Sequence, residues 1–320
     1  MTAPCPAPGL ISVLGAGVSG LCAATALSGR GLAVEVVVPG DAAPPVSHLA
    51  GGMLAPFCEG EVAPDAVIRG GRMSLDWWAR HVPGVERRGT LVIAPPRDAS
   101  ELDRFARATR GHRLADPSEI EPALEGRFSR ALFFADEAHL DPRKALAHLR
   151  DGLVARGVAF HDGPPRGRIV DCRGMGARHR LGDLRAVRGE MLELHTGEVV
   201  LSRPVRLLHP RFPCYIVPRG GGRFMIGATM VESAHAGGVT ARATMELLSA
   251  AYTVHPAFAE AEVTASGAGL RPAFPDNVPA IRRDGDRVHI NGMYRHGFLM
   301  APALAEALAH TLTQEMTHAH

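Results

Sequence analysis

A glycine-rich turn near the start of the chain constrains the fold more than any other feature. The hexapeptide GAGVSG occupies residues 15–20, directly after the short apolar strand formed by Ile11, Val13 and Leu14. A helical pattern of apolar residues follows, and a second apolar strand is expected over about 33–38. A GxGxxG turn between strand and helix in a βαβ unit of this length is typical of dinucleotide sites. The sequence therefore predicts an α/β fold that begins with a Rossmann-like unit.

Each position of the turn has a physical role in binding a nucleotide. Gly15 permits the tight turn, Gly17 lets a pyrophosphate approach the backbone, and Gly20 lets the helix pack on the strand. Val18 and Ser19 complete the predicted cofactor-binding turn.

One element of the nucleotide-binding pattern is missing. The acidic residue that usually holds a ribose hydroxyl at the end of the second strand is replaced by Val38, followed by Pro39. The ribose is then held by backbone groups, held by Asp41, or bound more weakly, and the sequence leaves these alternatives open.

Composition restricts the class of protein and its setting. The 320 residues are 46% hydrophobic and 21% charged with a net charge of +2, which gives no reason to expect a nucleic-acid or membrane partner. The five cysteines are odd in number and contain no CxxC pair, so neither a disulfide framework nor a metal site is expected. No signal peptide or apolar run of about 20 residues is seen, and a cytoplasmic protein is predicted.

A second glycine-flanked motif lies near the end of the chain. In NGMYRHGFLMAP, residues 291–302, an Arg-His pair stands between Gly292 and Gly297. A helix is predicted from Phe298 onward, with Pro302 in its first turn, where proline is tolerated. The N–H groups at such a helix start suit an anion or an electron-rich carbonyl.

Six motifs in order carry a resemblance that spans nearly the whole chain. GAGVSG is followed by SHLAGGMLAP at 47–56, YIVPR at 215–219, GATM at 227–230, GLRP at 269–272 and GMYRHGFLMAP at 292–302. Together they resemble the FAD-dependent D-amino-acid oxidase superfamily, and most closely the ThiO-type glycine oxidases of thiamine biosynthesis.

The resemblance implies a discontinuous Rossmann-like FAD-binding domain and a second, mainly antiparallel-sheet substrate domain. The FAD-binding domain is expected to comprise 1–84, 141–183 and 263–320, and the substrate domain 85–140 and 184–262. Strand-like runs such as GTLVIAP and RFMIGAT fall within the second set, as this division requires.

The resemblance also assigns roles to individual residues. Arg271 matches the residue that grips the substrate carboxylate, Tyr215 a tyrosine that hydrogen-bonds it, Arg295 a residue whose backbone carbonyl receives the amine, and Met230 an apolar wall. Arginine suits the carboxylate because its planar fork binds two oxygens at once. The remaining residues expected to contact FAD are Val38, Pro39, Val46, Ser47, Gly51, Gly52, Met53, Gly174, Met293, Tyr294, Arg295, His296, Gly297, Phe298 and Leu299.

The activity implied is oxidative deamination of glycine or another small amino acid. A hydride passes from the α-carbon to flavin N5, and dioxygen reoxidises the flavin to give an imine and hydrogen peroxide, with the imine supplying the thiazole of thiamine. Alternatives are an oxidase or dehydrogenase of sarcosine, proline or D-amino acids using another acceptor, a non-catalytic flavoprotein, or an NAD(P)-dependent dehydrogenase. A pyridoxal enzyme is nearly excluded, because Lys144 is the single lysine and lies in no supporting motif. Relatives are often tetramers, so a homo-oligomer is expected by analogy only.

Overall fold

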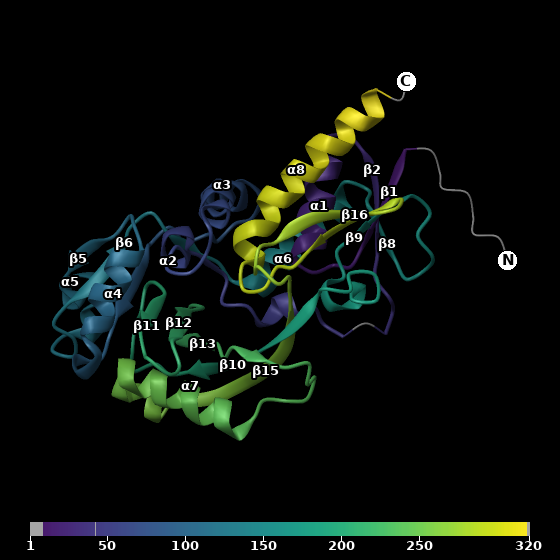
Figure 1. Cartoon of the computed structure of the whole chain (residues 1–320). Helices are drawn as coiled ribbons and strands as arrows, with labels where there is room; N and C mark the ends of the chain where they lie inside the picture. The colour runs from purple at the N-terminus through teal and green to yellow at the C-terminus, as the bar shows by residue number, and fades with distance from the viewer. Residues whose placement is uncertain (1–8, 42, 319–320) are drawn as a thin grey trace.

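Two large sheets organise the computed structural model, which describes residues 9–41 and 43–318. The remaining residues, all within the predicted FAD-binding domain, lie outside the described ones. One sheet is mostly parallel and the other mostly antiparallel, and helices cover both (Figure 1). The predicted α/β class with a second, mainly antiparallel sheet is confirmed.

The first sheet has six strands in the order β16-β17-β9-β1-β2-β8. The predicted βαβ unit forms its centre, because β1 pairs in parallel with both β2 and β9. Four further strands join from distant parts of the chain. The strand bounds are β1 Leu10–Leu14, β2 Ala33–Val37, β8 Ala159–His161, β9 Arg168–Asp171, β16 Ala280–Asp284 and β17 Arg287–Asn291.

Three helices, α1 (Val18–Gly29), α6 (Pro142–Ala155) and α8 (Gly297–Thr317), pack with this sheet around one apolar core. The glycines of the first turn are required sterically. Gly15 has φ +95°, and a Cβ on Gly20 would lie 1.8 Å from the Gly15 carbonyl oxygen. Helix α1 therefore starts directly against the end of β1. No helix of the described chain combines the length and apolar character needed to cross a membrane.

The second sheet has nine strands and its own apolar core. Its long strand β10 pairs antiparallel with β13 and β14 on one side and with the edge strand β15 on the other. Helix α7 (Ala241–Val254) packs against it (Figure 1). The strand bounds are β4 Thr90–Ile93, β5 Arg113–Ala115, β6 Ala131–Phe134, β10 Arg185–His195, β11 Val205–Leu207, β12 Cys214–Pro218, β13 Arg223–Gly227, β14 Val231–Glu232 and β15 Glu262–Ala273.

Shorter elements connect the two sheets. A two-stranded ladder joins β3 to β7, and helix α3 packs against α8. The bounds are β3 Met53–Leu54, β7 Ala138–His139, α2 Pro56–Glu59, α3 Asp65–His81, α4 Ser100–Ala108 and α5 Pro117–Ile120, with 3₁₀ turns η1 Val46–Leu49, η2 Pro96–Asp98, η3 Pro122–Leu124, η4 Gly174–Ala177 and η5 Pro256–Ala259.

The expected position of Pro302 in the first turn of the last helix is wrong. Helix α8 begins at Gly297, so Pro302 lies inside the helix and cannot donate to the carbonyl of Phe298 four residues earlier. The buried indole of Trp78, on α3, donates a 2.7 Å hydrogen bond to that carbonyl instead. A side chain from a neighbouring helix thus satisfies the group that the proline leaves free.

Replacing Trp78 with phenylalanine is expected to lower the free energy of unfolding by about 1–3 kcal/mol. The ring volume is largely kept, but the buried Phe298 carbonyl loses its partner. Denaturant unfolding of the holoenzyme measures the loss. The matched control is Trp77→Phe, whose indole donates to the partly exposed Glu306 carboxylate. An equal effect in both variants would refute the role of the carbonyl.

Candidate functional site

A cavity of about 700 Å³ extends from the β1–α1 turn to strands β10, β12 and β15 of the second sheet. Its walls come from every motif singled out in the sequence. At one end it is lined by the glycine turn and residues 43–47, and at the other by Tyr215, Met230 and Arg271. The chain between Ile290 and Leu299 runs along it, so widely separated segments form one continuous site.

Two helix N-termini face this cavity. Neither the α1 N-cap, Gly17, nor the α8 N-cap, His296, caps its helix with a side-chain hydrogen bond. The two ends lie close together, because a Cβ on Gly297 would lie 3.3 Å from Val18 Cγ1. The Val18 amide donates to the Ser47 hydroxyl at 3.1 Å. Unpaired N–H groups and the helix dipoles make this end suitable for a pyrophosphate and an electron-rich ring.

The carboxylates nearest to Val38 in sequence, Glu35 and Asp41, are not among the residues that line the cavity. Val38 and Pro39 line the cavity, whereas Asp41 is exposed and does not. Glu35, inside β2, is buried and bonded to Ser12 and to Arg166. Burial raises the pKa of Glu35, but these hydrogen bonds outweigh it and hold the pKa at about 2. Glu35 is therefore a structural carboxylate within the sheet.

Arg271 and Tyr215 converge at the other end of the cavity. The Arg271 guanidinium lies across Gly189, where a Cβ would be 2.3 Å from it, and its Nη1 donates to the Thr229 carbonyl at 3.0 Å. No carboxylate pairs with Arg271 in the part of the chain described. Burial lowers the pKa of Arg271 and raises that of Tyr215. The site thus offers a charged fork and a hydroxyl to an incoming anion.

Arg295 is held by a carboxylate that the sequence analysis did not identify. Its Nε and Nη2 atoms both lie 2.7 Å from Glu59 Oε2. Arg206, on β11, lies 3.8 Å from the other oxygen of Glu59. Both Glu59 and Arg206 line the cavity.

Met230 and Tyr294 meet where the two sheets face each other. The Tyr294 hydroxyl lies 2.7 Å from the Met230 sulfur, and Met230 is half exposed. Tyr294 has φ +46°, which is uncommon for a non-glycine residue, and its amide donates to the Pro272 carbonyl at 2.7 Å. The strained turn thus places the ring of Tyr294 beside the predicted apolar wall.

The structure brings nearly all the predicted site residues onto one cavity. Every candidate substrate and cofactor residue lines it except Gly20 and His296. Gly20 packs against Gly15, and the buried His296 lies 3.4 Å from Glu59. The sequence reasoning missed Glu59, Arg206 and Glu190. Of these, Glu59 carried the best available signal, because its CEGE stretch begins two residues after the end of SHLAGGMLAP.

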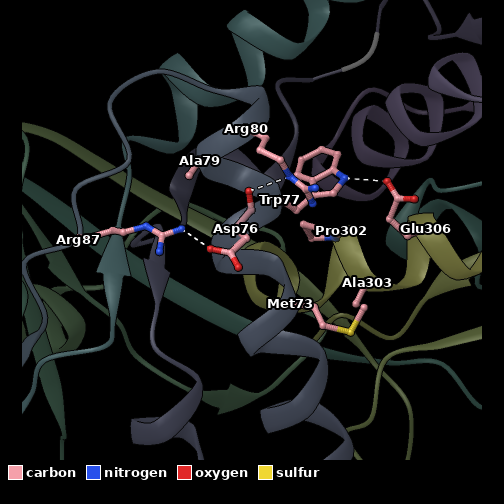
Figure 2. A pocket seen from close by; sticks show the side chains of 9 residues that line it. All are labelled: Met73, Asp76, Trp77, Ala79, Arg80, Arg87, Pro302, Ala303 and Glu306. Atoms are coloured by element: carbon pink, nitrogen blue, oxygen red, sulfur yellow. Dashed lines mark hydrogen bonds and ion pairs between the residues drawn. The ribbon is translucent and has the colours of Figure 1, made fainter.

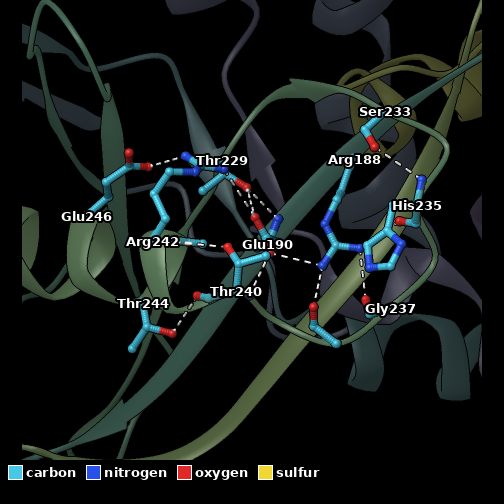
Figure 3. Close-up of polar contacts among 12 residues, drawn as sticks. Arg188, Glu190, Thr229, Ser233, His235, Gly237, Thr240, Arg242, Thr244 and Glu246 are labelled. Atoms are coloured by element: carbon cyan, nitrogen blue, oxygen red, sulfur yellow. Dashed lines mark hydrogen bonds and ion pairs between the residues drawn. The ribbon is translucent and has the colours of Figure 1, made fainter.

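Glu190 belongs to a network of polar contacts that includes Thr229 (Figure 3), the residue whose carbonyl accepts from Arg271. Its carboxylate accepts hydrogen bonds from Arg188, the Thr229 hydroxyl and the Thr240 amide, at 2.8–3.0 Å. Arg188 also donates to the backbone carbonyls of His235, Gly237 and Gly238. This pair therefore fastens the loop 233–240, and with it Ala236, beside the cavity.

Arg219, the last residue of the YIVPR motif, holds the Gly51-Gly52 stretch by hydrogen bonds to backbone carbonyls. Its guanidinium donates to the carbonyls of Leu140, Ala50 and Gly51. A Cβ on Gly51 would lie 2.7 Å from the ring of Tyr215. The glycine therefore lets the tyrosine ring lie directly on the cavity wall.

A second hollow, of about 560 Å³, opens between α3 and α8 (Figure 2). Its charged groups already pair with one another or with nearby residues. Arg87 bonds Asp76 at 2.5 Å, and Glu306 accepts from both Trp77 and Arg30. The large cavity is the better candidate site, because residues of all six sequence motifs line it.

Glu137 supports the short helix α2 that carries Glu59. The buried Glu137 carboxylate accepts a 2.7 Å hydrogen bond from the Cys58 amide. Burial raises the pKa of Glu137 from its ordinary value of 4.5 to about 7, against the hydrogen bonds from Thr90 and Cys58. The folded protein thus binds a proton here that the unfolded chain has lost by pH 7.

The wild type is expected to become less stable as pH rises because Glu137 must lose its proton, and Glu137→Gln should not show this decrease. Because the pKa of Glu137 is higher in the folded protein, the free energy of unfolding of the wild type should fall by about 3 kcal/mol relative to that of the variant between pH 4.5 and 8. The difference levels off above the folded pKa. Burial lowers the pKa of His139 to about 4, so this residue makes the free energy of unfolding rise with pH. The effect is the same in the wild type and the variant, and it cancels when the two free energies are subtracted. Unfolding curves from pH 4.5 to 8 measure it. The exposed Glu86→Gln is the control, and a pH-independent difference for Glu137→Gln would contradict the assignment.

Comparison with known proteins agrees with this geometry. The family described as FAD dependent oxidoreductase (DAO) matches residues 11–311. A Rhizobium etli protein named as the thiamine biosynthesis oxidoreductase ThiO is 53% identical, covering 95% of this chain and 97% of that protein. A Pseudomonas aeruginosa glycine oxidase is 27% identical, covering 93% of each chain. The crystal structure of a Bacillus cereus glycine oxidase superposes with a TM-score of 0.81 at 22% identity over 95% of each chain.

Proposed function

Because this chain belongs to the FAD-dependent oxidoreductase (DAO) family, we propose that it oxidises glycine or another small amino acid. The family is FAD-dependent, and the two helix N-termini that face the cavity, neither capped by its own N-cap side chain, fit that cofactor. The observation that carries the proposal is Arg271, a guanidinium without a carboxylate partner in the described chain, beside the Tyr215 hydroxyl.

The chain's own residues supply binding and orientation. Arg271 and Tyr215 hold the substrate carboxylate, and the backbone carbonyl of Arg295 receives the amine. Met230 and Tyr294 limit the room for a side chain on the α-carbon. When bound, FAD would supply the oxidising chemistry, as the acceptor of a hydride from the α-carbon, and dioxygen would be the final electron acceptor. Positioning is then the main contribution of the protein to the rate.

The likeness to the Rhizobium etli ThiO supports a place for the product in thiamine biosynthesis. In this proposal the glycine imine supplies the thiazole in the cytoplasm. We further propose that segments 1–84, 141–183 and 263–320 form the FAD-binding domain, and that 85–140 and 184–262 form the substrate domain.

An anaerobic titration of the purified holoenzyme with glycine tests the activity. Bleaching of the flavin absorption that reverses in air, with peroxide formed, is the expected result. Bleaching with slow recovery in air would replace dioxygen by another electron acceptor. A flavin that glycine does not bleach would overturn glycine as substrate, and sarcosine, proline and D-amino acids would be titrated next.

A further inference from the structure

Glu59 gives the substrate end of the cavity a negative charge among positive ones. Three guanidinium groups, those of Arg206, Arg271 and Arg295, line this part of the cavity. Arg271 is left free to bind a substrate carboxylate, whereas the other two face Glu59. The cavity thus contains one open anion site and a second anion site that the protein fills itself.

The geometry of that second site uses both oxygens of Glu59. Oε2 accepts from Arg295 at 2.7 Å, and Oε1 lies 3.8 Å from Arg206 Nη1. Arg206 also donates to Glu61 at 3.0 Å. The contact of Arg295 with Glu59 is short and charge-assisted, whereas that of Arg206 with Glu59 is a longer ion pair, and carboxylates of the protein balance both guanidinium charges.

Glu59 remains ionised although it is enclosed. Burial raises the pKa of its carboxyl, but Arg295, His296 and Arg206 outweigh burial and hold the pKa below its ordinary value. Tyr215, which lies against Gly51 on the same wall, feels the charges of Arg271, Glu59 and Arg295. The carboxylate therefore acts on the space that a substrate would occupy.

We propose that Glu59 restricts the cavity to substrates with a single carboxylate, by filling the site at Arg295 and Arg206 that a second carboxylate would take. The proposal rests on the proposed function, in which Arg271 binds the first carboxylate. A second substrate anion meets like charge from Glu59 and finds both guanidiniums paired, so desolvating it is not compensated. Neutralising Glu59 removes the repulsion and frees two cationic donors.

Binding of acetate and malonate to the FAD-loaded protein tests this directly. Neither acid has an amine to oxidise, and malonate adds one carboxylate to acetate. The change in the visible flavin spectrum gives a Kd for each. Glu59→Gln is expected to lower the ratio of the malonate Kd to the acetate Kd at least tenfold. The matched control, Glu86→Gln, makes the same change in net charge at an exposed pair with Arg88 and should leave the ratio within twofold.

The outcomes separate this proposal from the function on which it rests. If acetate binds both proteins and the ratio does not change in Glu59→Gln, the role of Glu59 is overturned and the Arg271 site stands. If Glu59→Gln loses acetate binding that the wild type shows, Glu59 serves the first carboxylate, which also overturns it. If acetate does not bind the wild type, the carboxylate site fails and both proposals fall.

A second variant covers the case in which Glu59→Gln does not retain FAD. In Arg206→Gln the carboxylate of Glu59 stays, while one of its two cations is lost. The same ratio should then rise at least threefold, because the negative charge is less compensated. An unchanged or lower ratio would overturn the proposal.

Discussion

Arg271→Ala is expected to raise the KM for glycine by about two to four orders of magnitude. A buried ion pair that loses one partner costs roughly 3–5 kcal/mol, and the substrate carboxylate would be left without its cation. Steady-state oxygen consumption over a wide glycine range measures the effect. FAD content should not change, since the guanidinium lies across Gly189 at the opposite end from the glycine turn.

The control for this variant is Arg283→Ala. Arg283 lies on β16, half exposed and paired with Glu315, so its loss removes the same charge far from the cavity. A KM for Arg271→Ala within threefold of the wild type would refute the carboxylate role and leave the substrate without an assigned anchor.

Arg188→Met is expected to lower the free energy of unfolding by about 3–5 kcal/mol. The change strands the buried Glu190 charge and removes the donors to three loop carbonyls, while the apolar stem is kept. Denaturant unfolding of the holoenzyme measures the loss. The loop 233–240 should also become sensitive to protease under native conditions, because Arg188 is what fastens it.

Arg242→Met is the matched control for Arg188→Met. Arg242 approaches the same Glu190 at 4.0 Å but is exposed and pairs mainly with Glu246, so its loss should cost at most about 1 kcal/mol. Equal losses for the two variants would show that total charge, and not the buried pair, stabilises the protein here.

Local patterns predicted the parts of the fold that depend on local physics. The glycine turn, the strand before it and the helix after it form one short βαβ unit, so residues near in sequence determine it. The helix start near Phe298 was predicted for the same reason. The prediction for Pro302 was wrong for a non-local reason. The hydrogen bond that the proline cannot make to the Phe298 carbonyl is replaced by one from Trp78, which lies 220 residues earlier along the chain.

The unpredicted part of the site depends on long-range pairing. Glu59 and Arg206 meet because β11 pairs with β4 while α2 packs above Glu137. No spacing in the sequence predicts the contact between these two residues. Taken alone, each of them is indistinguishable in the sequence from an ordinary charged residue on the surface. The same holds for Arg188 and Glu190, which occupy alternate positions of β10. From the sequence alone both would be expected on an exposed face, but in the structure the loop 233–240 covers them.

The central sheet also sets an order for biosynthesis. Strand β9 lies between β1 and β17, and α8 adds the second helix end at the cavity. The N-terminal βαβ unit leaves the ribosome first, yet its sheet gains β16 and β17 only after residue 291 has been made. Contacts between such distant segments form slowly, because closing a long loop costs entropy. The cavity is therefore complete only when the segment that carries β17 and the start of α8 has joined the sheet.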